Sequence, residues 1–248
     1  MSYIRIIPSL LLNKKKFVKG QIFSKHRNAG YPSTTCLAYE SQKADELLIM
    51  DIDSYKNRNI DPDFETLNEI SKNISTPITF GGGIKNINDA KRAFAAGADK
   101  IYLNTILFKN INIISEIKKI YGSQAIMAGL NIISDKNNYF LLEDNNKTID
   151  IINYIKYLED FGVGEIKINF VNNEGLCNGM DVNYSKIIMN KIKVPCIFEG
   201  GVGKIEHIIQ MIQIGATAIA LGTILTFKDY NIYKIKQELY NYNFKVRY

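Results

Sequence analysis

The sequence contains few of the side chains from which disulfide frameworks and metal centres are built. Its three cysteines, Cys36, Cys177 and Cys196, are scattered over 248 residues, and an odd number without paired spacing is typical of free thiols in a reducing compartment. The two histidines, His26 and His207, lie far apart, and His207 falls inside a predicted helix. We therefore expect neither a metal site nor a bound cofactor.

Long apolar runs and basic stripes are also missing. No stretch is long enough to span a bilayer, and the opening RIIPSLLLNKKK lacks the pattern of a signal peptide. The formal charge of +6 comes mainly from scattered lysines that do not alternate with stacking aromatics. We therefore expect a cytoplasmic protein that binds neither nucleic acid nor membrane. The densest basic run, Lys14 to Lys16, is either a solvated loop or a loop that covers an anionic ligand.

One stretch, residues 77–105, carries the clearest positive signal. Its sequence, PITFGGGIKNINDAKRAFAAGADKIYLNT, follows the order strand, glycine turn, helix, strand and second turn. Three glycines after the first strand leave backbone N–H groups accessible, and the next helix directs its positive end at the same point. Either these glycines bind a phosphate or they form only a tight turn.

A second copy of this stretch lies at residues 195–223, PCIFEGGVGKIEHIIQMIQIGATAIALGT. The copies align without a gap, so that Gly82-Gly83 matches Gly200-Gly201 and Thr105 matches Thr223. Two weaker pairs, RIIPSL with AIMAGL and DELLIMDID with GEIKINFVN, share an offset of about half the chain. The sequence therefore predicts two similar halves, roughly residues 1–120 and 121–248.

The alternation of strand-like and helix-like segments predicts the fold. Strands are expected near residues 4–12, 46–53, 77–81, 99–104, 124–132, 164–171, 194–199 and 217–222. Helices are expected near residues 33–43, 62–73, 87–96, 111–120, 149–161, 182–191, 204–214 and 230–240. Eight such units favour an α/β fold of the (β/α)8 TIM-barrel type in one domain, residues 1–248, over an open doubly wound sheet.

Residues 133–148 are too polar for a helix. Two short runs, Tyr139 to Leu142 and Lys147-Thr148, indicate a small β-hairpin inserted after the fifth strand. Ligands of this fold bind at the carboxyl ends of the strands, where the glycine turns lie.

Over nearly its whole length the chain resembles the cyclase subunit of imidazole glycerol phosphate synthase, a twofold-repeated barrel of histidine biosynthesis. The resemblance rests on RII at 5–7, FVKG at 17–20, DEL at 45–47, FGGGI at 80–84, GADK at 97–100, NT at 104–105, GSQA at 122–125, GEI at 164–166, GGVGKIEH at 200–207 and the closing KVR. In that family the two glycine-bearing ends hold the two phosphates of a long bisphosphate substrate, so the resemblance implies two phosphate sites for a phosphorylated small molecule. These comprise Gly82, Gly83, Asn104 and Thr105, and Gly200, Gly201, Gly222 and Thr223.

The resemblance fails where that family carries its general acid and base. The two matching positions hold Leu11 and Asn131, which cannot exchange a proton near neutral pH. Lyase activity is therefore uncertain, and the remaining candidate carboxylates are Asp51, Asp53 and Glu174. Lys19 is retained on a loop that the resemblance places over the substrate.

The opposite end of the barrel matches the family closely. There a glutaminase subunit binds, and its ammonia passes a gate of four charged residues, which match Arg5, Glu46, Lys100 and Glu165. Two cations and two anions at four strand starts can pair alternately into a ring, either as a gate or as a plug that stabilises the barrel. Asp99 and Gln124 match family positions at the glutaminase contact.

A retained gate beside a missing acid–base pair resembles a divergent branch associated with surface-polysaccharide (lipopolysaccharide) synthesis. In that branch ammonia goes to a sugar amidotransferase that forms an acetamidino group. The hypothesis is an ammonia-conducting subunit of this kind. The alternatives are an active cyclase in histidine biosynthesis with displaced catalytic groups, and a barrel that only binds a phosphorylated regulator.

Overall fold

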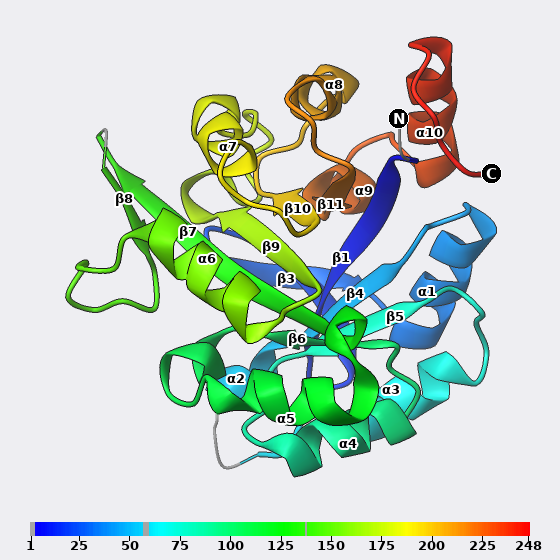
Figure 1. Ribbon diagram of the computed structural model, residues 1–248. Helices are drawn as coiled ribbons and strands as arrows, with labels where there is room; N and C mark the ends of the chain where they lie inside the picture. Colours follow the sequence, from blue (N-terminus) through cyan, green and yellow to red (C-terminus); the bar gives the residue numbers. More distant parts are fainter. Residues whose placement is uncertain (1–2, 57–59, 137) are drawn as a thin grey trace.

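The computed structural model describes residues 3–56, 60–136 and 138–248. Its centre is a closed barrel of parallel strands (Figure 1). The barrel strands are β1 (Arg5–Asn13), β4 (Leu47–Asp51), β5 (Ile78–Gly81), β6 (Lys100–Leu103), β7 (Ile126–Asp135), β9 (Glu165–Phe170), β10 (Cys196–Glu199) and β11 (Ala218–Leu221). Strand β1 pairs in parallel with β4 on one side and with β11 on the other, where Arg5 lies opposite Ala218. This closure confirms the (β/α)8 barrel and excludes the open sheet.

Helices surround the barrel on the outside (Figure 1). The described residues form α1 (Pro32–Ser41), α2 (Ile52–Lys56), α3 (Phe64–Ser71), α4 (Ile87–Ala95), α5 (Asn112–Tyr121), α6 (Ile151–Phe161), α7 (Val182–Met189), α8 (Ile205–Gln213), α9 (Thr223–Phe227) and α10 (Ile232–Asn241). Short 3-10 helices cover Thr105–Phe108, Ser123–Ala125 and Val171–Asn173. The eight predicted helices are confirmed, whereas the short helices α2 and α9 were not predicted. No helix among the described residues is long and apolar enough to cross a membrane.

The two predicted copies have the same structure. Strand β5, helix α4 and strand β6 of the first copy correspond to β10, α8 and β11 of the second. Gly97 and Gly215, which match in the alignment, end their helices with φ angles of 105° and 100°. Only glycine adopts this conformation without strain, so the repeat extends to the backbone.

Strand residues alternate between two cores, as a barrel requires. Outward-facing side chains pack against the helices in one large cluster, and inward-facing ones fill the barrel. The inner cluster contains Ile7, Leu48, Tyr102, Met127, Ile197, Ala218 and Ala220.

The predicted inserted hairpin is present but begins earlier than expected. Strand β7 continues to Asp135 and pairs antiparallel with β8 (Asn138–Leu141). The prediction of a strand at Lys147-Thr148 was wrong, because this segment folds back in a turn in which Asp144 accepts the backbone N–H of Thr148.

The β2–β3 hairpin, near the N-terminus, was not predicted. Strands β2 (Lys16–Gln21) and β3 (Ser24–Gly30) extend from β1, with Leu11 opposite Val18. Of the basic run, Lys14 and Lys15 form the turn between β1 and β2, and Lys16 begins β2. Lys19 therefore lies in a strand and is buried, rather than in a covering loop.

Candidate functional site

The four charged residues predicted at the strand starts form a closed ring. Lys100 Nζ lies 2.8 Å from Oε2 of Glu46 and 3.0 Å from Oε2 of Glu165. Arg5 Nη1 lies 3.2 Å from Oε2 of Glu46, and its Nη2 contacts Oε1 of Glu165. Each carboxylate therefore bridges both cations, so that charges alternate around the ring.

Burial explains why all four members are needed. The Glu46 and Glu165 side chains are almost inaccessible, while those of Arg5 and Lys100 are 24% and 22% exposed. A buried carboxylate without a partner would be costly, and here each has two cationic partners. Two other predicted residues of this face, Asp99 and Gln124, are exposed. Asp99 accepts the backbone N–H of Ile78, and Gln124 donates to the carbonyl of Tyr121.

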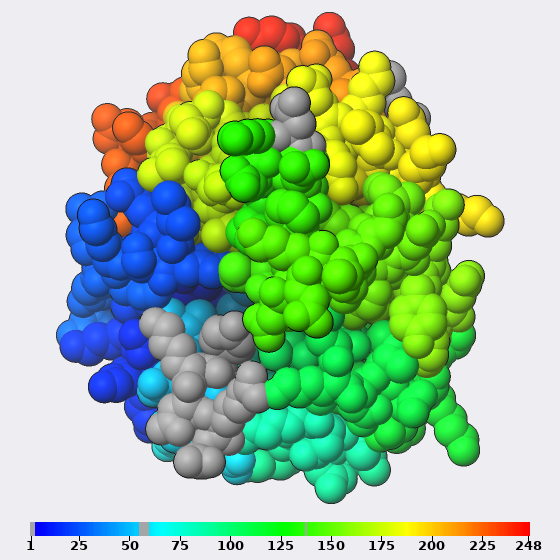
Figure 2. Space-filling model, turned by 90° about the vertical axis from the view of Figure 1, so that its left-hand side faces the viewer, coloured from blue at the N-terminus to red at the C-terminus, as the bar shows by residue number. Residues whose placement is uncertain are grey.

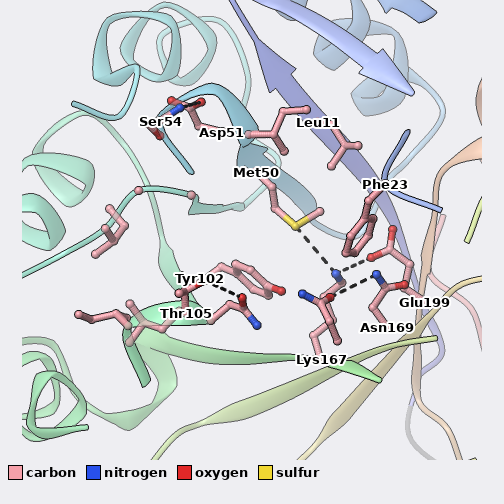
Figure 3. Close-up of a pocket in the computed structure, with 18 of the residues that line it drawn as sticks. Leu11, Phe23, Met50, Asp51, Ser54, Tyr102, Thr105, Lys167, Asn169 and Glu199 are labelled. Carbon is pink, nitrogen blue, oxygen red and sulfur yellow. Dashed lines mark hydrogen bonds and ion pairs between the residues drawn. The ribbon is translucent and has the colours of Figure 1, made fainter. Parts of the chain in front are cut away.

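A buried lysine lies above the ring. Strand β9 places Glu165 in the ring, Lys167 two residues further on and Asn169 at the mouth, all facing inward. Lys167 is 1% exposed and forms an ion pair with Glu199 on β10. Its ammonium also lies 5.2 Å from the centre of the Tyr102 ring. Figure 3 shows Lys167 reaching towards Met50 and Glu199.

The Lys167–Glu199 pair also contacts the β2–β3 hairpin, through Lys19 on β2. Lys19 Nζ lies 4.0 Å from Glu199 and 2.7 Å from Oε1 of Glu174. Burial alone would raise the pKa of Glu199, but Lys167 and Lys19 hold it below its usual value. Burial would likewise lower the pKa of Lys167, and Glu199 raises it. The four side chains therefore form a buried chain of two ion pairs, Lys167–Glu199 and Lys19–Glu174, which meet between Lys19 and Glu199.

A cavity of about 220 Å³ opens at the carboxyl ends of the strands. Figure 2 shows the surface hollowed between the β2–β3 hairpin, in blue, and the β7–β8 hairpin, in green. Its lining includes the apolar side chains of Leu11 and Met50, the ring of Tyr102 and the amide of Asn169 (Figure 3). The amides of Asn104 and Asn131 also line it. The cavity extends down to Lys167, so it has a charged floor.

The first predicted phosphate site lines this cavity. Gly82 and Gly83 have φ angles of 95° and 71°, which favour glycine at the turn after β5. Asn104 donates a 2.8 Å hydrogen bond to the carbonyl of Gly129, and Thr105 contacts Asn104 through its hydroxyl. The cations Lys85 and Lys109 also line the cavity. Backbone N–H groups, a hydroxyl and two ammonium groups suit an anion.

The second predicted phosphate site has the same backbone but different surroundings. Gly200 and Gly201 have φ angles of 106° and 101°, close to those of the first site. Among the described residues that line the mouth cavity, none belongs to this group. Lys19 packs so closely on Gly222 that a Cβ there would lie 2.6 Å from its Nζ. The Thr223 hydroxyl is buried and has no hydrogen-bond partner among the residues that the structure describes.

The positions that lack the acid–base pair face the mouth. Leu11 lines the cavity with an apolar side chain. Asn131 donates a 2.7 Å hydrogen bond to Oε1 of Glu143 and accepts one of 3.3 Å from Asn169. Sequence analysis did not identify Glu143, which lies after β8 in the inserted segment. Burial raises the pKa of Glu143, and the hydrogen bond from Asn131 opposes this shift.

The three remaining carboxylate candidates have structural contacts. Asp51 accepts the backbone N–H groups of Asp53, Ser54 and Asp63, so it caps α2 and ties down the following loop. Burial raises the pKa of Asp51 against these hydrogen bonds. Asp53 lines a separate surface depression with Lys14 and Lys15 rather than the mouth. Glu174 is held by Lys19.

Sequence reasoning also missed Lys167 and Glu199. A signal was present, because a lysine and a glutamate interrupt otherwise apolar strand segments, EIKINF and CIFE. His207 lies in helix α8 as predicted, and its Nδ1 accepts the backbone N–H of Gly203.

Comparisons with known proteins agree with this architecture. The model of the histidine biosynthesis protein family matches residues 5–231. The chain is 34% identical to imidazole glycerol phosphate synthase subunit HisF of Methanococcus vannielii, over 98% of both chains. It is 33% identical to a Campylobacter jejuni protein provisionally named as subunit hisF2, over 98% of both chains. A Vibrio vulnificus protein provisionally named as subunit hisF3 is 31% identical over 96% of this chain and 92% of its own. The chain therefore belongs to the histidine biosynthesis protein family, as a divergent member of the HisF-type cyclase subunits.

Proposed function

We propose that this chain is the barrel subunit of a glutamine amidotransferase and conducts ammonia from a glutaminase. The partner binds the N-terminal face of the barrel, around Asp99 and Gln124. Ammonia then passes through the ring of four charged residues, Arg5, Glu46, Lys100 and Glu165. It moves through the barrel interior to the mouth. The observation that supports this proposal is the closed ring of alternating charges.

The residues above the ring suit the passage of an uncharged molecule such as ammonia. The inner cluster directly above it is largely apolar, and Lys167 is paired there with Glu199. Moving an ammonium ion through such surroundings would be costly because it loses its hydration. Neutral ammonia avoids this cost. The interior therefore favours ammonia over ammonium.

At the mouth, the chemistry differs from that of an ordinary cyclase. Leu11 cannot transfer a proton, and the amide of Asn131 has no acid–base function near neutral pH. We infer that ammonia is handed to a sugar amidotransferase, for an acetamidino group on a surface-polysaccharide sugar. The similarity to proteins named hisF2 and hisF3, rather than only to HisF, supports a role beside histidine biosynthesis.

The protein would work in the cytoplasm as a single barrel domain, and its free cysteines Cys36, Cys177 and Cys196 fit that compartment. A phosphorylated small molecule would bind at the mouth, where Gly82, Gly83 and Thr105 present anion-binding groups.

Reconstitution with the cognate glutaminase tests the proposal. Binding of the barrel should raise the rate of glutamine hydrolysis, whereas a barrel that serves only as a regulator would leave that rate unchanged. The complex should also convert the family's bisphosphate substrate at least 100-fold more slowly than an ordinary HisF complex, since the loss of general acid–base catalysis costs about 10²–10⁴-fold. Turnover equal to that of an ordinary complex would establish an active cyclase instead.

A further inference from the structure

We infer that Tyr102 and Lys167 close the barrel between the charged ring and the mouth, and that this inner closure keeps water at the mouth away from the ammonia path. The inference rests on the proposed function and deepens it. It adds a second barrier above the ring, built from residues that the resemblance to the cyclase family did not select.

Tyr102 lies at the boundary between the mouth and the barrel interior. It belongs to the inner cluster and also lines the mouth cavity, and among the described members of that cluster it alone does both. Other members, such as Ile7, Leu48 and Met127, are 0% exposed. Tyr102 itself is only 7% exposed although it borders the cavity. The side chain of Tyr102 therefore separates the cavity from a dry interior.

The ring of Tyr102 lies against two neighbouring strands at positions where both carry glycine. A Cβ on Gly81 of β5 would lie 2.8 Å from the ring atom Cδ1, and a Cβ on Gly129 of β7 would overlap the tyrosine hydroxyl. Neither glycine has a positive φ angle, so the backbone conformation does not explain them. Both glycines therefore provide space for the ring, because a side chain at either position would displace it.

Lys167 extends the closure from strand β9. Its ammonium lies 5.2 Å from the centre of the Tyr102 ring and 3.9 Å from the sulfur of Met50 on β4. The ion pair with Glu199 on β10 holds the ammonium in this position. In Figure 3, Tyr102, Met50 and Glu199 lie around Lys167. Side chains from four strands thus meet at the floor of the cavity.

A closure at this level protects the reactivity of ammonia. Ammonia that meets bulk water at neutral pH takes up a proton, and the resulting ammonium has no lone pair with which to attack an acceptor. An interior closed to water therefore keeps ammonia unprotonated until it reaches the mouth. Because Tyr102 and Lys167 fill the passage, they have to move when ammonia passes. The flexible four-carbon stem of Lys167 allows such a movement without a change in the strand.

Thiol labelling of the isolated barrel tests the closure without the glutaminase. Leu48→Cys places a thiol in the inner cluster, and its labelling by iodoacetamide is followed by peptide mass spectrometry. Adding Tyr102→Ala should raise this labelling rate at least tenfold. Tyr102→Phe, which keeps the ring, should change it less than twofold. The native thiol of Cys36, buried in the outer core, reports on global unfolding and should keep its rate in every variant.

Equal labelling rates at position 48 in the Tyr102→Ala and Tyr102→Phe variants would overturn the inference. If fast labelling of Cys36 shows that Tyr102→Ala is unfolded, Tyr102→Leu takes its place. Leucine keeps an apolar side chain but is too short to cover Gly129, so the rate at position 48 should rise at least threefold. A rate equal to that of Tyr102→Phe would again overturn the inference.

The complex with glutaminase tests whether the closure serves ammonia transfer. With glutamine labelled with ¹⁵N in its amide, Tyr102→Phe should keep the wild-type ratio of labelled product to glutamate. Tyr102→Ala should give less than half that ratio, because ammonia in an open interior escapes as ammonium. A wild-type ratio in the folded Tyr102→Ala variant would overturn the assignment to the ammonia path. If the wild-type complex itself shows no coupling, the proposed function fails, while thiol labelling still decides whether the closure exists.

Discussion

Asn131 donates a 2.7 Å hydrogen bond from its side-chain amide to the carboxylate of Glu143, twelve residues further along the chain. The pair places a carboxylate beside Asn131, a position that lines the mouth and itself lacks one. Glu143 arrives from the inserted hairpin segment rather than from a strand end. A carboxylate from the inserted segment therefore lies next to the position at which strand β7 carries an amide.

The first prediction concerns Glu143 and pH. Burial raises its pKa above the usual 4.5, so the folded protein binds this proton more tightly than the unfolded chain. Stability is therefore highest below the unfolded pKa and falls as pH rises through the folded pKa. Glu143→Gln keeps the acceptor for Asn131 and removes this loss. We expect a higher Tm than wild type at pH 7.5, by a few degrees since about 1 kcal/mol corresponds to about 2–4 °C, and no difference at pH 4. A lower Tm at pH 7.5 would contradict the account.

The second prediction concerns the lost aspartate at position 131. Asn131→Asp would bring a second carboxylate within hydrogen-bonding distance of Glu143, and two such charges repel. The variant should melt at a lower temperature than wild type at pH 8, and acidification to pH 5 should restore part of the difference. Combining it with Leu11→Asp should not improve the native reaction. A Tm at pH 8 equal to that of wild type would show that the two side chains do not interact.

The third prediction concerns the buried pair of Lys167 and Glu199. Lys167→Met leaves Glu199 without its principal partner and should destabilise the protein by about 3–5 kcal/mol in urea unfolding. Because Lys167 lowers the pKa of Glu199, its contribution is present above the unfolded pKa and is lost as pH falls through the folded pKa. The double variant Lys167→Met, Glu199→Leu should recover most of the loss. A double variant as unstable as the single one would mean that packing, not charge, determines the effect.

The fourth prediction separates a structural from a catalytic role for Asp51. Asp51→Ala removes the acceptor of three backbone N–H groups and should cost about 1–3 kcal/mol for each donor left buried without a partner. Asp53→Ala, in the separate depression beside Lys14 and Lys15, serves as the control and should change stability by less than about 0.5 kcal/mol. If Asp51→Ala unfolds at the same urea concentration as wild type, the capping role is wrong.

The barrel could be predicted because its signals are local, whereas the ring residues were identified through the resemblance to the cyclase family. Each strand and helix shows its own periodicity, and the twofold repeat fixes how the units correspond. The resemblance selects Arg5, Glu46, Lys100 and Glu165, and a closed barrel then brings these four strand starts together at one end. Their mutual contacts then follow from charge.

The β2–β3 hairpin could not be predicted because its turn contains none of the residue types that usually form such turns. Ile22 and Phe23 have φ angles of 48° and 57°, where glycine or asparagine is the usual choice. Tertiary contacts hold this turn instead: the Ile22 N–H donates to the carbonyl of Glu174, and the Phe23 N–H donates to its side chain. A loop from the other half of the barrel thus supplies the hydrogen bonds.

Glu143 was missed for a similar reason. It lies in an irregular segment, and its contact with Asn131 exists only because β8 folds back along β7. The predicted candidates Asp51 and Glu174 lie close to strand ends in sequence. Their oxygens, however, bind backbone N–H groups and Lys19. Sequence spacing locates strand-end residues well and locates residues from inserted segments poorly.

The central claim is that ammonia travels through the ring. The ratio of ammonia incorporated into product to glutamate released measures this passage directly. Glutamine labelled with ¹⁵N in its amide is supplied to the complex with its acceptor, and labelled product is compared with glutamate released. Wild type, Arg5→Ala and Lys100→Ala are compared with Lys118→Ala, a control on helix α5, after each is shown to be folded by its Tm. We predict nearly one labelled product per glutamate for wild type and the control, and less than half that ratio for both ring variants. A ratio unchanged in the folded ring variants would contradict the account.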